Sequence, residues 1–204
     1  MRTNIQALII CFIVFCPTFL FGKEIKYKVA DIPKELRENA QSVVRNDVME
    51  LEINSINSAT LKVFFAITVL NKNGIDDAYF SVHYDKFSKV SNIKGKVFNE
   101  NGEQIKRIPA DEILDISSIN GFSIFEDNRR KYFDPKVRTI PFTVEYSYEV
   151  SYSDILDYPN WTPYAGFGIS TEFSSMKVIA PANFPLRYNE SLLAKKIHYN
   201  VMEN

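Results

Sequence analysis

Carboxylates are the side chains of this sequence that could do hydrolytic chemistry. Closely spaced acids occur at Asp76/Asp77, Glu126/Asp127 and Asp154/Asp157. Hydrolysis of a glycosidic bond needs two carboxyl groups on facing elements roughly 5 to 10 Å apart, and neighbours in one turn do not supply that separation by themselves. We therefore expect these acids to serve turns and the surface.

Histidines and cysteines are too few, or wrongly placed, for a metal or nucleophile site. The histidines are His83 and His198, without an H-x-H or H-E-x-x-H spacing, whereas zinc needs three or four ligands. Cys11 and Cys16 both lie in an apolar N-terminal stretch that we expect to be removed. The expectation is a protein with no catalytic residue, no metal site and no cofactor.

An aromatic loop is the first candidate binding site. Tyr158, Trp161 and Tyr164 lie close together, and Pro159 and Pro163 flank the single tryptophan. Stiff aromatic loops make contact surfaces of low entropy cost for sugars or protein partners. The alternative, which we favour, is a hydrophobic lid that closes one end of the fold.

A charged run is the second candidate. Arg129 and Arg130 are followed by Lys131 and preceded by the acids of Glu126–Asp127. Such a run is most often a solvated face, whose exposed ion pairs contribute little. The alternative is a docking patch for an acidic neighbour.

The stretch Phe142 to Tyr152 is the element that organises the chain. Aromatic and β-branched residues alternate over its whole length with Thr, Glu and Ser. A period of two predicts a strand buried on one side, with Glu145 and Glu149 on the outward side and paired across strands with lysines.

The remaining pattern predicts an all-β fold, an antiparallel β-sandwich with one or two short helical turns, cut short at its C-terminal end. Asn101-Gly102 marks a hairpin before a strand at 104–108, and Thr60 to Leu70 reads as a central strand. Other strands are expected at Ser42 to Ile53, Ala78 to Tyr84, Val90 to Asn99, Ile169 to Ile179 and from Ile197, with a turn at Asn71 to Gly74, helical turns at Ile32 to Arg37 and Asp111 to Ile116, and a less regular region at Phe122 to Pro141.

The first 22 residues have the layout of a secretory signal peptide. Arg2 precedes an apolar run, Ile5 to Phe21, which is interrupted at Pro17. The alternative is an uncleaved membrane anchor. We expect an exported protein of the periplasm or cell envelope of a Gram-negative-type bacterium, with residues 23–204 as one domain and no membrane span after cleavage. With 24 basic and 25 acidic residues interspersed, nucleic acid is not an expected partner.

Several phrases of the sequence are similar to an exported bacterial domain of unknown function. They are YKVADIP at Tyr27–Pro33, YDKFSKV at Tyr84–Val90, GFSIFEDNR at Gly121–Arg129, PFTVEY at Pro141–Tyr146 and YPNWTP at Tyr158–Pro163. In the family that this chain resembles, the domain precedes a transglutaminase-like, papain-related core.

The resemblance implies a non-catalytic N-terminal module that presents substrate to, or docks against, a downstream core carrying a Cys-His-Asp triad. No residue here matches that triad, so none is carried over. The implied partner is the downstream core of the same polypeptide, with a cell-envelope protein or glycan as a further possibility. The alternative function is a separate secreted module that binds a glycan or peptide through the loop around Trp161.

Overall fold

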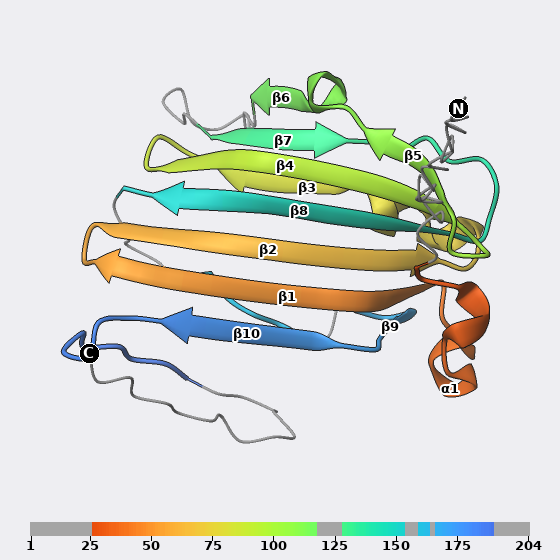
Figure 1. The fold of residues 1–204 in the computed structure, drawn as a ribbon, viewed down its shortest axis with the longest axis horizontal. Coiled ribbons are helices and arrows are strands. Elements are labelled where there is room, and N and C mark those ends of the chain that lie inside the picture. Colours follow the sequence, from red (N-terminus) through yellow and green to blue (C-terminus); the bar gives the residue numbers. More distant parts are fainter. Residues whose placement is uncertain (1–25, 118–127, 154–158, 164–165, 190–204) are drawn as a thin grey trace, which may run out of the picture.

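The computed structural model describes residues 26–117, 128–153, 159–163 and 166–189, and strands dominate these ranges (Figure 1). The strands are β1 (Ser42–Ser55), β2 (Ser58–Val69), β3 (Phe80–Tyr84), β4 (Ser88–Asn99), β5 (Gln104–Ile108), β6 (Leu114–Ser117), β7 (Arg129–Phe133), β8 (Phe142–Tyr152), β9 (Ile169–Thr171) and β10 (Ser174–Ile179). The helical elements are α1 (Lys34–Arg37) and the 3₁₀ turns η1 (Val29–Asp31), η2 (Lys72–Ala78) and η3 (Ala110–Glu112).

Two sheets make up the fold. The large sheet has the order β10-β1-β2-β8-β4-β5, with β9 also paired to β1, and the small sheet has the order β3-β7-β6. In Figure 1, β3 lies behind β4 and β8, and β7 and β6 follow above β4. The predicted all-β sandwich is confirmed, although the pairing is not antiparallel throughout, because β9 and β10 both run parallel to β1.

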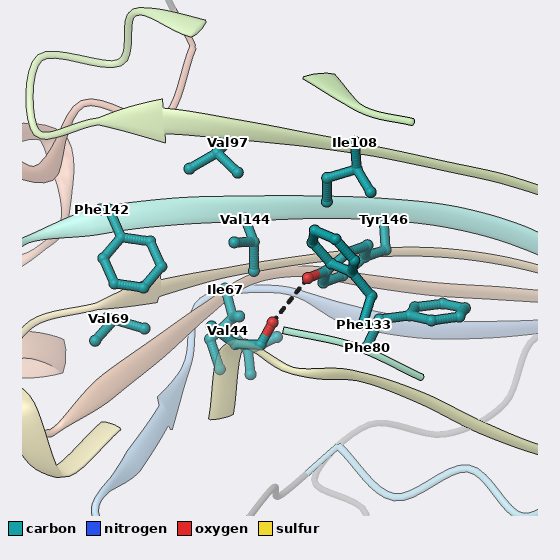
Figure 2. Packing of buried hydrophobic residues seen from close by; sticks show 11 residues of the cluster. Val44, Ile67, Val69, Phe80, Val97, Ile108, Phe133, Phe142, Val144 and Tyr146 are labelled. Atoms are coloured by element: carbon teal, nitrogen blue, oxygen red, sulfur yellow. Dashed lines mark hydrogen bonds between the residues drawn. The ribbon is translucent and has the colours of Figure 1, made fainter. Parts of the chain in front are cut away.

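The core lies between the two sheets and follows the alternation of β8. Phe142, Val144 and Tyr146 share one buried cluster with Phe80 and Phe133 of the small sheet, and in Figure 2 Tyr146 lies next to Phe80 and Phe133 while Phe142 lies beside Val69. The buried phenol of Tyr146 donates a 2.8 Å hydrogen bond to the carbonyl of Ala78. Burying each large apolar side chain contributes roughly 1.5 to 3 kcal/mol, so a slip of one residue in β8 would be very unfavourable.

Residues 26–32 cover part of the other face of the large sheet. The backbone N–H of Lys26 donates to the carbonyl of Gly102 at 2.8 Å, and the N–H of Val29 donates to that of Glu100 at 3.0 Å. Gly102 has a φ of +76°, and a Cβ there would lie 2.4 Å from the Lys26 carbonyl oxygen. The Asn101-Gly102 hairpin predicted from the sequence is therefore confirmed, and its glycine also admits the N-terminal segment.

Four local predictions differ from the structure. The stretch Asp111 to Ile116 is not one helical turn, since η3 ends at Glu112 and β6 begins at Leu114. The region Phe122 to Pro141 contains strand β7, which extensive charge had hidden from the period-two analysis. Ile169 to Ile179 is two short strands rather than one. The turn at Asn71 to Gly74 continues as the longer 3₁₀ turn η2, which the side chain of Asn71 caps. The signal peptide and the strand from Ile197 lie outside the described residues.

Candidate functional site

Trp161 is held against the edge of the large sheet. Its indole Nε1 donates a 2.8 Å hydrogen bond to the hydroxyl of Ser174 on β10. The hydroxyl of Thr171 donates to the carbonyl of Pro163 at 2.9 Å, which ties the same loop to β9. Tyr158 and Tyr164 lie outside the described residues, so Trp161 is the described aromatic residue of this candidate site.

The hydrogen bond from Trp161 continues into a partly buried carboxylate. The Ser174 hydroxyl donates to Asp47 of β1 at 2.8 Å. Burial raises the pKa of the Asp47 carboxyl, and the hydrogen bond from Ser174 opposes this by lowering it. Asp47 and Ser174 face each other in the parallel β1–β10 pair, so the chain of bonds joins the loop, β10 and β1.

Arg129 and Lys131 converge on one carboxylate. Arg129 Nε donates to Asp115 at 2.9 Å, Lys131 Nζ lies 3.0 Å from the same carboxylate, and the Tyr84 hydroxyl donates to it at 2.7 Å. The hydrogen bond from Tyr84 is the largest cause that lowers the pKa of Asp115 to about 2; desolvation opposes it, and the hydrogen bonds from Lys131 and Arg129 lower the pKa further. Most of the positive charge of this run is therefore directed at an internal partner.

Arg130 points to the opposite side of β7. Its guanidinium carbon lies 5.1 Å from the ring centre of Tyr132, a cation–π contact, and the Tyr132 ring meets Tyr79 edge to face at 5.8 Å. The register pairs Arg130 with His83 on β3 and with Ile116 on β6. The structure thus separates Arg129 from Arg130, although they are neighbours in the sequence.

The other residues singled out from the sequence do not gather around a reactive centre in the described part of the chain. His83 is exposed on the small sheet, and Asp77 accepts a 3.1 Å hydrogen bond from Gln41. Among the described residues, no group of three or more His, Cys, Asp or Glu is placed to hold a metal ion. Glu126, Asp127, Asp154, Asp157 and His198 lie outside the described residues.

A buried carboxylate is the feature that sequence reasoning missed. Glu145 is on the outward face of β8, as predicted, and pairs across strands with Lys96 at 3.8 Å, but only 8% of the residue is exposed. Lys26 Nζ lies 2.6 Å from its Oε2, and the Tyr27 hydroxyl donates to the same oxygen at 2.7 Å. The family resemblance of YKVADIP singled out this segment in the sequence, but no local sequence pattern shows that the segment covers Glu145.

Arg45 extends this network to the other edge of the sheet. It is buried, its Nε donates to the carboxylate of Glu172, and its Nη1 donates to the carbonyl of Lys28 at 3.3 Å. Its guanidinium carbon lies 5.7 Å from the ring centre of Tyr27. The N-terminal segment is therefore anchored to β1 and β8 by charged groups with specific partners.

The uncovered part of the outward face has a shallow hollow of about 530 Å³. Its lining includes the apolar residues Val48 and Phe64 and side chains of opposite charge, two lysines (Lys62 and Lys94) and two glutamates (Glu50 and Glu149). Glu149 accepts a 2.8 Å hydrogen bond from Asn92. The hollow is open and its charges balance, so it shows no preference for a charged ligand.

Comparison with known families matches the chain to a domain family. A family model described as "Domain of Unknown Function with solved-structure structure (DUF3857)" matches residues 57–201. The match begins after β1, yet β1 lies inside the large sheet between β2 and β10. A search of curated proteins finds no match. Within the described residues, no helix is long and apolar enough to cross a membrane.

Solved structures that match the chain include two named proteins. A protein named "putative protease" from Parabacteroides distasonis ATCC 8503 superposes with a TM-score of 0.58 at 8% identity, over 71% of this chain and 30% of that one. This likeness is one of fold, and this chain spans about 30% of the length of that protein. A "putative nutrient binding protein" from Legionella pneumophila, at 10% identity over 56% of this chain and 41% of that one, has a TM-score of 0.22, which supports no argument.

Proposed function

Because the chain belongs to the DUF3857 family, whose function is unknown, we propose that it is a non-catalytic β-sandwich module of a larger exported protein, which it serves by docking or by presenting substrate. The partner that we propose is a downstream transglutaminase-like core, which would carry the chemistry. This assignment goes beyond the family match and is open to direct test.

The observation that carries the proposal is that polar groups which could do chemistry are committed to partners within the domain. Glu145 holds the N-terminal segment, Trp161 holds β10 through Ser174, and Asp115 holds Tyr84 with two cations. A general acid or base must instead reach the proton that it transfers on a substrate. These contacts stabilise a scaffold.

The structural comparison supports the same proposal at the level of fold. The Parabacteroides protein contains a similarly folded region that is a minor part of its length, and its name assigns it to proteases. A fold found within a larger protein is consistent with a module, whereas function must be argued from the site itself. We propose that this chain likewise lies next to a catalytic part of a larger protein.

Activity measurements on the purified, processed chain test the non-catalytic role. We expect no hydrolysis of a fluorogenic peptide and no incorporation of a labelled amine into a glutamine-containing peptide. Turnover that co-purifies with the chain and is lost in His83→Ala or Asp77→Asn would contradict the proposal. The gene beyond codon 204 gives a second test, since the proposal expects codons there for Cys, His and Asp in a transglutaminase-like arrangement.

The alternative is a glycan- or peptide-binding module that uses Trp161. The hydrogen bond from its indole to Ser174 and the bond from Thr171 to Pro163 favour a structural lid instead. Trp161→Ala should then lower the melting temperature by several degrees, because packing and a hydrogen bond are both lost. An unchanged melting temperature together with lost binding on a glycan array would favour the binding module.

A further inference from the structure

Strand β6 is ordered without burying a residue. All four of its residues are exposed, including Leu114 at 54% and Ile116 at 36%. It lies at an edge of the small sheet and pairs only with β7 among the described strands. An edge strand with exposed large apolar side chains is a site where proteins ordinarily guard against association.

The exposed apolar side chains share a face with residues typical of protein interfaces. Leu114 lies opposite Tyr132, and Ile116 lies opposite Arg130. We define the docking face as the outward side of the small sheet, formed by Ser81, His83, Leu114, Ile116, Arg130 and Tyr132. Tyr and Arg are enriched at interface positions that carry most of the binding energy, and Tyr132 already orders the Arg130 side chain by stacking.

The charge of the small sheet is positive, although that of the chain is not. Strands β3, β6 and β7 carry three cations and one carboxylate, whereas the whole chain has a net charge of −1. The carboxylate, Asp115, binds Arg129 and Lys131 on the opposite side of β7. Within the described residues Arg130 makes no ion pair, so its charge is available on the docking face.

We propose that the docking face binds an acidic, partly apolar surface of a protein partner, which places a carboxylate on Arg130 and apolar side chains over Leu114 and Ile116. The inference rests on the proposed function, because it identifies the partner as the neighbouring part of the same larger protein. A protein surface fits better than nucleic acid, since phosphate contacts gain nothing from Leu114 and Ile116 along the edge of the face. It also fits better than an anionic membrane, because Arg130 is the one cation among the six residues of the docking face, whereas membrane surfaces attract clusters of Lys and Arg.

Fluorescence anisotropy tests this proposal with the processed chain and a labelled eight-residue peptide that alternates Asp and Leu. Arg130→Glu should weaken binding about tenfold or more, because it places like charges together. Leu114→Ser should weaken it by about threefold to tenfold through lost apolar contact. The matched controls are Arg107→Glu on β5 and Ile56→Ser at the β1–β2 turn, both exposed, and each should change the affinity less than twofold.

Several outcomes would overturn the proposal. The first is an affinity for a Lys-Leu peptide equal to that for the Asp-Leu peptide. The second is a loss of affinity in the control variants equal to that in the docking-face variants. The third is binding of duplex DNA or phosphatidylglycerol vesicles that is as tight as binding of the Asp-Leu peptide. If Arg130→Glu fails to fold by circular dichroism, Ile116→Ser takes its place, and normal binding by that variant would also contradict the docking face. Enzymatic turnover by a chain that still binds the acidic peptide would reject the proposed function and leave the docking face intact.

Discussion

The phenol of Tyr27 donates a 2.7 Å hydrogen bond to the carboxylate of Glu145, which lies 118 residues further along the chain. The Tyr27 ring also packs edge to face on Phe98 of β4, with the ring centres 5.3 Å apart. One residue of the N-terminal segment therefore joins a buried charge on β8 to an apolar side chain on β4. Burial is the main cause that raises the pKa of the Tyr27 phenol, and the bond to Glu145 adds to it.

Tyr27→Phe should lower the free energy of unfolding by about 1 to 3 kcal/mol, because it leaves a buried carboxylate short of a donor. Urea unfolding at neutral pH gives this value from the shift of the midpoint between the two proteins, provided that the dependence of the unfolding free energy on urea concentration is unchanged. The matched control is Tyr84→Phe, which removes a hydroxyl bound to the exposed Asp115 and should cost less than about 1 kcal/mol. Equal losses of stability in the two variants would contradict the expectation that the buried hydrogen bond contributes more than the exposed one.

Glu145→Ala should destabilise the fold by about 2 kcal/mol or more, since it removes the common partner of Lys26, Tyr27 and Lys96. Glu149→Ala, four residues along the same face of β8, should change the stability by no more than about 0.5 kcal/mol. Thermal unfolding of both variants checks the contrast. Similar melting temperatures would show that the N-terminal segment does not depend on Glu145.

The raised pKa of the Tyr148 phenol predicts a loss of stability in alkaline solution. Burial is the main cause that raises its pKa to about 12, and the nearby Tyr152 and Asp47 add to it. The folded state therefore binds the phenolic proton more tightly than the unfolded state does. This contribution is complete below about pH 10, the ordinary value for tyrosine, and disappears as the pH rises through about 12.

Absorbance at 295 nm and circular dichroism, recorded along one titration, check this prediction. Ionisation of the buried tyrosines and loss of β signal should coincide, and Tyr148→Phe should make the stability fall less steeply with pH. Tyrosines that all ionise near pH 10 in a chain that stays folded would contradict it.

Asp115 should remain ionised in moderately acidic solution. Its pKa of about 2 is lower than the ordinary 3.8, and the hydrogen bond from Tyr84 is the largest cause. Its contribution to stability is therefore present above about pH 4 and is lost as the pH falls through about 2. NMR titration of the carboxyl carbon should give this value, and Tyr84→Phe should raise it. Tyr79→Phe, which affects Asp76 instead, should leave it unchanged.

Local pattern was sufficient where apolar and polar residues alternate along one strand. The alternation of Phe142 to Tyr152 predicted β8 with the bounds that the structure shows, because successive side chains in a strand point to opposite faces. Asn101-Gly102 predicted its hairpin because glycine adopts a positive φ without strain. Strand β7 was missed because its residues before Phe133 are charged or partly exposed on both faces, which removes the period-two signal.

The amino-acid pattern was enough to establish the all-β class, the organising strand and the face on which Glu145 and Glu149 lie, since these follow from the geometry of neighbouring residues. The folded chain was needed to show that Lys26 and Tyr27 cover Glu145, that Trp161 bonds to Ser174, and that Arg129 and Arg130 face opposite sides of one strand with different partners. Those contacts join segments far apart in the chain, and the burial of a charge depends on which distant segment covers it.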